Sequence, residues 1–483
     1  MLDLAMVRTE PERVIAALAR RGLAAEAVRE VARLDTAWTD RQDVREVLRQ
    51  RRRRISEEVA RAKDEARDTA AFEEMGRRVG DELAAIETEM GGLEARRQAA
   101  LEALPNLPAT DTPDQVAEPA DARTPAWPKP FAPLHHADLV EMLGLARAPA
   151  SAGRGFLVWR GLGARLIRAL TNFMLDVHTR EFGCEEVRAP APATRAALTG
   201  SAHLPALEGK MYAVTEPAAP EPAAGAAGHA QTSQDLFLAP RAEPHLAGLF
   251  AGEILDASRL PVRLASAGPA FRREAGGGGA AGRGLERLHQ FDTVELYVFA
   301  AHEQAEEELT RAVRAAETIL ARLEVPHRRR LRPAPDLSLA AAKTIDLEAW
   351  APGMTAAGEK GSDPLSVKGS DPFSPSPGTN ERRGQEPNGL GLQTPSLAPP
   401  SPPRGRWLPV AALSSFTDYQ ARRTDTRYRD ARGHVRLVHT LGGAAVALPH
   451  LVAAMLENGQ EADGSVRLPA ALAPYFGEEM LRA

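Results

Sequence analysis

One stretch, residues 271–296, constrains the fold of this chain more than any other. It reads FRREAGGGGAAGRGLERLHQFDTVEL, and the alternation near its end is typical of a half-buried strand. We predict two strands joined by a long glycine-rich loop. An arginine fork on the first strand could bind a phosphate, and a glutamate at the end of the second could accept a hydrogen bond from a hydroxyl or an amine. An ordinary hairpin with a glycine-rich tip would fit the pattern as well, because a glycine run alone specifies no ligand.

The same stretch resembles motif 2 of the class II aminoacyl-tRNA synthetases, and in particular the seryl-tRNA synthetase pattern FRxEAG…GRxxxGLxRxHQFxKVE. The resemblance runs from Met1 to the C-terminus with one interruption. It implies an α+β fold, in which an N-terminal antiparallel helical hairpin, a coiled-coil arm, precedes a class II catalytic-type domain with an antiparallel sheet. It also implies ATP and Mg²⁺ as cofactors if the protein is active.

The first 110 residues carry two apolar stripes at near-heptad spacing, separated by the polar residues 64–69. This pattern predicts a long antiparallel helical hairpin with strongly charged faces. Such a charge run is usually only a solvated face. The opening MLDLAMVRTEPERV, however, resembles that of seryl-tRNA synthetase, whose hairpin grips the long variable arm of the cognate tRNA. By this resemblance, the residues that would meet phosphates of a tRNA of the serine type are Arg41, Arg45, Arg49, Arg52, Arg53 and Lys63.

The remaining chain divides by composition and resemblance. A linker rich in Pro, Asp, Thr and Ala is predicted for residues 111–130, and a synthetase-like catalytic domain for residues 131–483. Residues 355–404 have no counterpart in the family, and their Pro, Ser and Gly content predicts a disordered insertion. Residues 162–190 show the apolar spacing of an amphipathic helix followed by a strand. They resemble motif 1, the dimer interface of class II enzymes, which implies a homodimer.

Composition excludes several classes of protein. A net charge of -5 gives no overall nucleic-acid signature, so any RNA contact must be local. The single cysteine, Cys184, excludes a disulfide framework and a cysteine-rich zinc site, and no apolar run reaches membrane-spanning length. We expect a cytoplasmic protein with no membrane contact. The His135-His136 pair lacks further ligands at usable spacing, so we predict no metal site in the protein.

The resemblance assigns residues to both halves of a substrate pocket. The ATP-binding positions are Arg272, Arg273, Glu274 and Leu288, where the first arginine corresponds to the family's α-phosphate ligand. The amino-acid pocket comprises Thr232, Ser233 and Gln234, placed on the family's TxE loop, and Glu295, which corresponds to the acid that reads the serine side chain.

Several of these positions depart from the family. Gln234 places a neutral amide where the family has the carboxylate that takes the serine ammonium, and a buried ammonium without a counterion is costly. The family's E[IV]SS segment, its NGSG serine and its motif 3 arginine correspond to Pro409, Ala411, Ala412, Ala444 and His450. Together these changes remove carboxylates, hydroxyls and a phosphate ligand from a site that acts as a unit.

Three functions therefore remain open. The first is a seryl-tRNA synthetase-like protein with a degenerate serine and ATP pocket, a divergent paralogue that binds tRNA without ordinary serine activation. The second is an active serine–tRNA ligase with unusual ligands. The third is a ligase that adenylates another small acid.

Overall fold

The computed structural model describes the chain except for residues 119–123, 150, 152–154, 216–234, 274–283 and 355–404. The predicted disordered insertion, the glycine run of residues 276–279 and the triplet 232–234 lie outside the described residues. No helix in the described part of the chain has an apolar stretch long enough to cross a bilayer.

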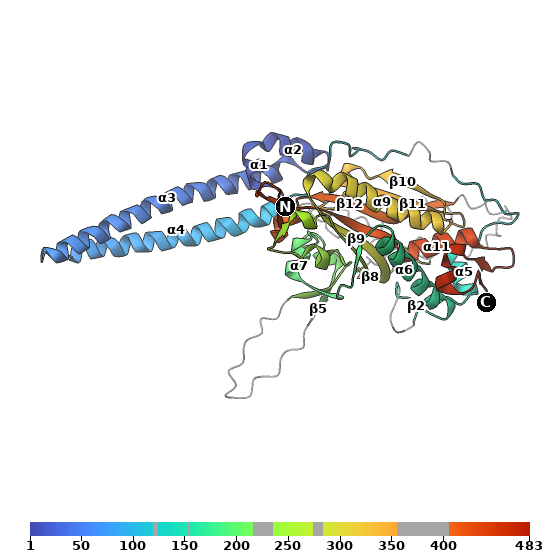
Figure 1. Ribbon diagram of the computed structural model, residues 1–483. Helices are drawn as coiled ribbons and strands as arrows, with labels where there is room; N and C mark the ends of the chain where they lie inside the picture. The colour runs from blue at the N-terminus through green and yellow to red at the C-terminus, as the bar shows by residue number, and fades with distance from the viewer. Residues whose placement is uncertain (119–123, 150, 152–154, 216–234, 274–283, 355–404) are drawn as a thin grey trace, which may run out of the picture.

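The N-terminal module is a long helical hairpin that projects from the body (Figure 1). Helices α3 (Ala25–Asp64) and α4 (Ala70–Ala103) run antiparallel, and their turn falls in the polar stretch that separated the two apolar stripes. Midway along the hairpin, Leu48 and Ile55 of α3 pack against Val79 and Leu83 of α4. The predicted coiled-coil arm is confirmed.

Two short helices brace the base of the arm. They are α1 (Leu4–Thr9) and α2 (Pro11–Ala19), and both pack against α3. Arg8 donates to Asp35 at 2.7 Å and Arg97 donates to the same carboxylate at 2.8 Å, which ties α1, α3 and α4 together. The hydrogen bond from Arg8 lowers the pKa of Asp35, so this carboxylate stays charged at neutral pH.

The body is built on a seven-stranded sheet with the order β10-β11-β12-β15-β9-β8-β3. Neighbouring strands are antiparallel except β3, which runs parallel to β8. The predicted class II type of antiparallel sheet is therefore confirmed. In sheet order, the strands are β10 (His327–Leu331), β11 (Lys343–Ala351), β12 (Arg406–Thr417), β15 (His439–Ala447), β9 (Gln290–Ala300), β8 (Val262–Phe271) and β3 (Glu185–Val187).

The second strand predicted from residues 271–296 is β9. The first coincides only with the end of β8, which stops at Phe271, and the two strands are neighbours in the sheet. They pair over their full length, from Val262 opposite Phe299 to Phe271 opposite Gln290. Side chains alternate along β9, as the period of two requires. Val294, Leu296 and Val298 join one core, whereas the intervening side chains point to the opposite face.

Three helices cover one face of the sheet and enclose the larger core (Figure 1). They are α6 (Leu162–Arg180), α9 (Ala305–Arg322) and α11 (Leu448–Gly459). The apolar stripe of α6, which includes Leu166 and Leu170, packs inside the chain rather than facing outward. The predicted amphipathic helix is thus present, and its role in a dimer remains a prediction.

Small elements complete the body. The helices are α5 (His136–Met142), α7 (Arg195–Gly200), α8 (Glu243–Ala247), α10 (Ala421–Thr424) and α12 (Ala473–Phe476). Strand β6 (Leu236–Leu238) pairs with β4 (Pro192–Thr194) and β5 (Tyr212–Val214). The other short strands are β1 (Ala146–Arg147), β2 (Val158–Trp159), β7 (Ile254–Asp256), β13 (Arg427–Arg429), β14 (Val435–Leu437), β16 (Val466–Arg467) and β17 (Met480–Leu481).

Candidate functional site

A cavity of about 40 Å³ lies on the face of the sheet opposite the three covering helices. Arg272, Glu295 and Ala444 line it, and they come from neighbouring parts of the sheet. Glu295 of β9 is directly opposite Ala444 of β15, and Arg272 follows the last residue of β8, where its N–H donates to the His289 carbonyl at 2.9 Å. The structure therefore brings together the predicted phosphate arginine and the predicted substrate glutamate.

Glu295 is the most deeply buried carboxyl in this pocket, with 1% of its surface exposed. Its Oε2 accepts a hydrogen bond from the N–H of Glu243 at 3.0 Å, whereas Oε1 has no partner among the described residues. Burial raises the pKa of Glu295 to about 7, because the charged form has lost its hydration. A buried acceptor without a partner is unfavourable in the empty pocket and is ready to accept from a ligand.

Glu243 is a second buried carboxylate beside Glu295, and the sequence reasoning did not single it out. It stands at the start of α8, where Gln420 donates to its Oε1 at 2.8 Å and Arg241 donates to its Oε2 at 3.3 Å. The run Arg241-Ala242-Glu243 keeps the glutamate of a TxE triplet but has arginine in place of threonine. This partial match, directly after β6, is the signal that would have found Glu243. The predicted triplet at residues 232–234 stays a prediction.

A small apolar cluster lies beside Glu295, and one of its members, Ala444, lines the pocket. Ala412 of β12 and Ala444 of β15 face each other across neighbouring strands, and with Ala447 they form a separate small cluster. No side chain of this cluster can donate or accept a hydrogen bond. Ala411, which the sequence grouped with these positions, belongs instead to the main core beneath the helices. Of the two alanines that match the family's hydroxyls in this segment, only Ala412 therefore faces the pocket side.

His450, predicted at the position of the motif 3 arginine, is buried in the first turn of α11. Its Nδ1 lies 2.7 Å from the carbonyl oxygen of Pro409, and its Nε2 lies 3.4 Å from that of Glu286. Arg406 of β12 forms an ion pair with the Glu286 carboxylate. Because both imidazole nitrogens face backbone carbonyls, His450 joins α11 to β12 and to the loop that contains Glu286.

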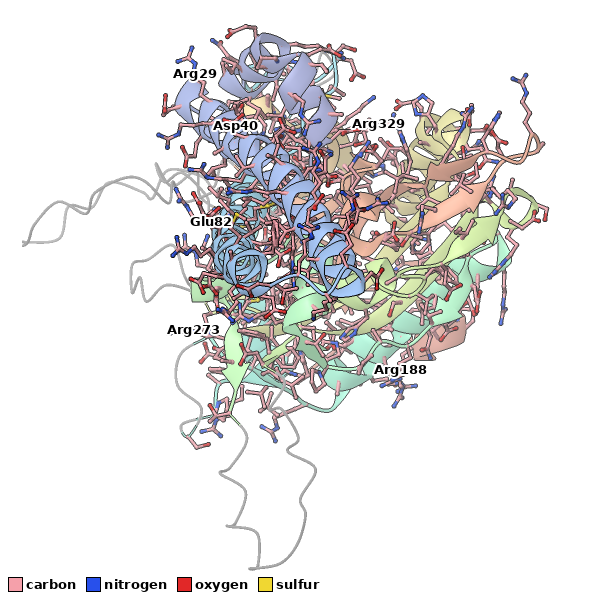
Figure 2. All side chains as sticks on the ribbon, turned by 90° about the vertical axis from the view of Figure 1, so that its left-hand side faces the viewer. Arg29, Asp40, Glu82, Arg188, Arg273 and Arg329 are labelled. Carbon is pink, nitrogen blue, oxygen red and sulfur yellow. The ribbon has the colours of Figure 1, made fainter. Side chains whose placement is uncertain are left out.

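The other predicted ligands fall into two groups. Leu288 and Arg273 are described: Leu288 is 5% exposed in the core, and the Arg273 N–H donates to the Lys210 carbonyl at 2.9 Å. Figure 2 shows Arg273 at the edge of the body below the end-on view of the arm. Glu274 and the triplet Thr232, Ser233 and Gln234 lie outside the described residues.

The histidine pair predicted to be structural belongs to a hydrogen-bonded cluster. The ligand atoms of His135, His136 and Glu457 lie within 4.8 Å of one another. His136 Nδ1 contacts Glu457 Oε1 at 2.8 Å, and its Nε2 accepts from the Leu285 N–H at 3.2 Å. Burial lowers the pKa of His136 to about 4 and raises that of Glu457 to about 7. These hydrogen bonds join α5 to α11, and Glu457 is a ligand-type partner of the pair that the sequence analysis did not foresee.

The basic residues of the arm differ in how their charges are engaged. Four of the six predicted phosphate contacts form ion pairs with glutamates, namely Arg41 with Glu89, Arg49 with Glu87, Arg53 with Glu57 and Lys63 with Glu73. Arg45 has a buried Nε with no hydrogen-bond partner in the described part of the chain. Arg51, Arg52 and Arg54 are exposed and have no acidic partner within the described chain. Of the basic residues near the middle of α3, these three therefore have positive charge available to a partner.

The comparison with known families covers both modules. The family described as "Seryl-tRNA synthetase N-terminal domain" matches residues 1–108, and the "tRNA synthetase class II core domain (G, H, P, S and T)" matches residues 229–459. A protein named "Serine--tRNA ligase" from Gemmatimonas aurantiaca is 38% identical over 444 residues, which is 90% of this chain and 88% of the relative. The chain belongs to the seryl-tRNA synthetase family.

Other members of the seryl-tRNA synthetase family match over the whole length. The relative from Thermotoga neapolitana is 35% identical over 100% of both chains. The structure of seryl-tRNA synthetase from Pyrococcus horikoshii complexed with ATP has a TM-score of 0.78 at 28% identity and covers 100% of this chain and 99% of its own. The cytoplasmic serine-tRNA ligase of Naegleria fowleri, at 21% identity and a TM-score of 0.74 over 100% of this chain and 99% of its own, supports the fold alone.

Proposed function

We propose that this protein is a divergent member of the seryl-tRNA synthetase family that binds tRNA through its arm and does not activate serine in the ordinary way. The observation that carries the proposal is the apolar wall beside Glu295, in which Ala444 lines the pocket and Ala412 and Ala447 pack against it. The resemblance places hydroxyls on this wall. Their loss leaves one side of the pocket without groups that could orient a polar substrate.

Amino-acid activation depends on positioning and on charge stabilisation, because no covalent protein nucleophile is required. The amino acid must hold its carboxylate against the α-phosphate while its ammonium is neutralised. Beside this pocket the buried Glu243 carboxylate accepts from both Gln420 and Arg241. An ammonium placed there would lie beside the Arg241 guanidinium, and like charges at such short range repel.

The residues present fit a bound nucleotide only in part. When bound, ATP would supply the adenylyl group that activates a carboxylate. Arg272 lines the pocket and could hold a phosphate with its fork of donors. At the positions that the resemblance assigns to the metal and the γ-phosphate, Pro409 has no side-chain ligand for Mg²⁺, and His450 already contacts two carbonyl oxygens. We therefore infer weak or absent ATP binding.

The arm retains what phosphate binding needs. Arg51, Arg52 and Arg54 are exposed without acidic partners among the described residues, so no internal ion pair has to break when they meet a phosphate. Contacts of this kind release counterions, so affinity falls steeply with salt and depends little on base sequence. A tRNA with a long variable arm, as serine tRNAs have, is the partner that we infer, and the cytoplasm is the compartment where we expect it. We also infer a homodimer through residues 162–190, as in the resemblance to motif 1.

An active serine–tRNA ligase is the second candidate. Arg272 and Glu295 line one pocket, the Glu243 N–H contacts Glu295, and full-length relatives are named for that activity. Under this alternative the hydrogen bond from Arg241 to Glu243 would have to break, and the serine ammonium would take its place on the Glu243 carboxylate. The two candidates therefore differ in what Arg241 does when serine is present.

The tRNA half of the proposal is tested by fluorescence anisotropy with two RNAs that differ in one feature. A serine-type tRNA is compared with the same molecule whose variable arm is shortened. We expect the intact tRNA to bind at least about tenfold more tightly, with a steep dependence on salt. Equal affinity for both RNAs would show that the helical arm of the protein does not recognise the variable arm of the tRNA and has only a structural role.

A further inference from the structure

Arg241 brings hydrogen-bond donors into the pocket that no group of the described chain uses. Its side chain is 18% exposed and lines the cavity that contains Glu295 and Ala444. Its only hydrogen bond within the described residues is the one from Nη1 to Glu243 Oε2, at 3.3 Å. A guanidinium carries five N–H donors in a planar fork that matches a carboxylate. Most of that fork therefore remains for a ligand.

Glu295 offers the complementary group at the floor of the same cavity. Its Oε1 is buried without a partner among the described residues, and its position is fixed because Oε2 is held by the Glu243 N–H. A ligand hydroxyl can donate to this oxygen. The pocket thus presents an acceptor for a hydroxyl beside donors for a carboxylate.

The rest of the wall restricts the ligand. Ala270, Met211 and Ala444 line the cavity with apolar atoms, and the cavity volume is about 40 Å³. Lys210 and Arg272 line it as well, which adds positive charge to the same wall. His203, also in the lining, is held neutral because burial lowers its pKa to about 4. The pocket therefore favours a small anionic ligand and disfavours a ligand that also carries a positive charge.

We propose that this pocket binds a small hydroxycarboxylate that lacks an α-ammonium group, with Arg241 on the carboxylate and Glu295 on a hydroxyl. The inference rests on the proposed function, because it assumes that serine is not the ordinary ligand. Glycerate is a suitable probe, since it matches serine in size and in its carboxylate and terminal hydroxyl but carries a hydroxyl in place of the ammonium.

The test is isothermal titration of the full-length protein at pH 7.5, without ATP or tRNA, with glycerate and with L-serine. We expect glycerate to bind at least about tenfold more tightly than L-serine, because a hydrogen bond to a charged group is gained and a repulsion is avoided. Arg241→Gln should weaken glycerate binding by about tenfold or more and should leave serine binding unchanged or stronger. Arg188→Gln is the control, since Arg188 is exposed and does not line the cavity.

Two outcomes would overturn the inference: L-serine binding as tightly as glycerate, or glycerate binding that Arg241→Gln leaves unchanged. If Arg241→Gln does not fold, the relative affinities of glycerate and L-serine for the unmodified protein still test the inference. This test is separable from the proposed function. Failure of glycerate to bind in a protein that also lacks serine-dependent exchange removes only the present inference, whereas serine-dependent exchange removes the proposed function.

Discussion

The arm and the pocket use charge in opposite ways. Along the arm, charged side chains are exposed, and each ion pair joins two groups that water also solvates, as with Arg41 and Glu89. Such pairs contribute little individually. At the pocket, Glu295 and Glu243 are almost fully buried. The energetic cost of each buried carboxylate oxygen therefore depends on whether that oxygen has a hydrogen-bond partner. The arm therefore tolerates single changes and works by the sum of its charges, whereas the pocket works through a few specific contacts.

The largest effect that follows from this comparison is removal of the arm. Arg41 and Glu89 touch at 2.8 Å, so residues 42–88 can be replaced by a short glycine linker without disturbing the cluster around Asp35. We expect tRNA affinity to fall by about 100-fold or more, with loss of the salt dependence, because the phosphate contacts are gone. Anisotropy titrations over a range of salt concentrations measure both. If the truncated protein binds tRNA as tightly as the full chain, the arm is not the tRNA-binding region.

A smaller effect separates available charges from paired ones. Replacing Arg51, Arg52 and Arg54 by glutamine should weaken tRNA binding by about tenfold. It should also lower the slope of log affinity against log salt by about 2 to 3, since each lost phosphate contact contributes about 0.7 to 0.9. The matched control replaces three ion-paired arginines, Arg41, Arg49 and Arg53. If the control triple weakens binding as much, intramolecular pairing does not decide which arginines bind RNA.

The extent to which the sequence predicts these two regions differs for a physical reason. Arm helices and central strands follow from periodicity, because the turn at residues 64–69 and the alternation along β9 are local properties. Pocket contacts depend on chain segments that are far apart in sequence. The pairing of Glu243 with Gln420, 177 residues away, is invisible to any local pattern.

The face that a pocket residue occupies is also hard to predict. Ala411 and Ala412 point to opposite faces, as consecutive strand residues do, so the first lies in the main core and the second faces Ala444. The pairing of β11 with β12 has an irregularity here, since Leu347 pairs with Ala411 while the next residue pairs with Pro409. A bulge of this kind shifts which side chains face the pocket, and nothing in the local sequence marks it. The TxE resemblance was assigned to the earlier triplet at residues 232–234, so the roles of Arg241 and Glu243 were not predicted.

The smallest expected effect concerns the stability of the pocket rather than its function. Burial raises the pKa of Glu295 to about 7, so the folded state binds its proton more tightly than the unfolded state. The cost of the buried charge is present above pH 7 and disappears as the pH falls toward the unfolded value near 4.5. Glu295→Gln should therefore raise the free energy of unfolding at pH 8 by up to about 3 kcal/mol and should have no such effect below pH 5.

Urea unfolding at both pH values measures this difference. Glu186→Gln serves as the control, because Glu186 is exposed and its replacement should change stability little at either pH. An equal gain for Glu295→Gln at pH 8 and pH 5 would mean that the charge of Glu295 is not the cause.

The central claim is that the arm has kept its function while the pocket has lost ordinary serine activation. Serine-dependent ATP–pyrophosphate exchange by the unmodified protein tests it most directly. We predict exchange indistinguishable from the rate without amino acid, and the same for Ala444→Ser, because one restored hydroxyl leaves Arg241, Pro409 and His450 unchanged. Serine-dependent exchange on the order of 1 to 10 per second, the range of typical enzyme turnover, would contradict the account and establish the active ligase.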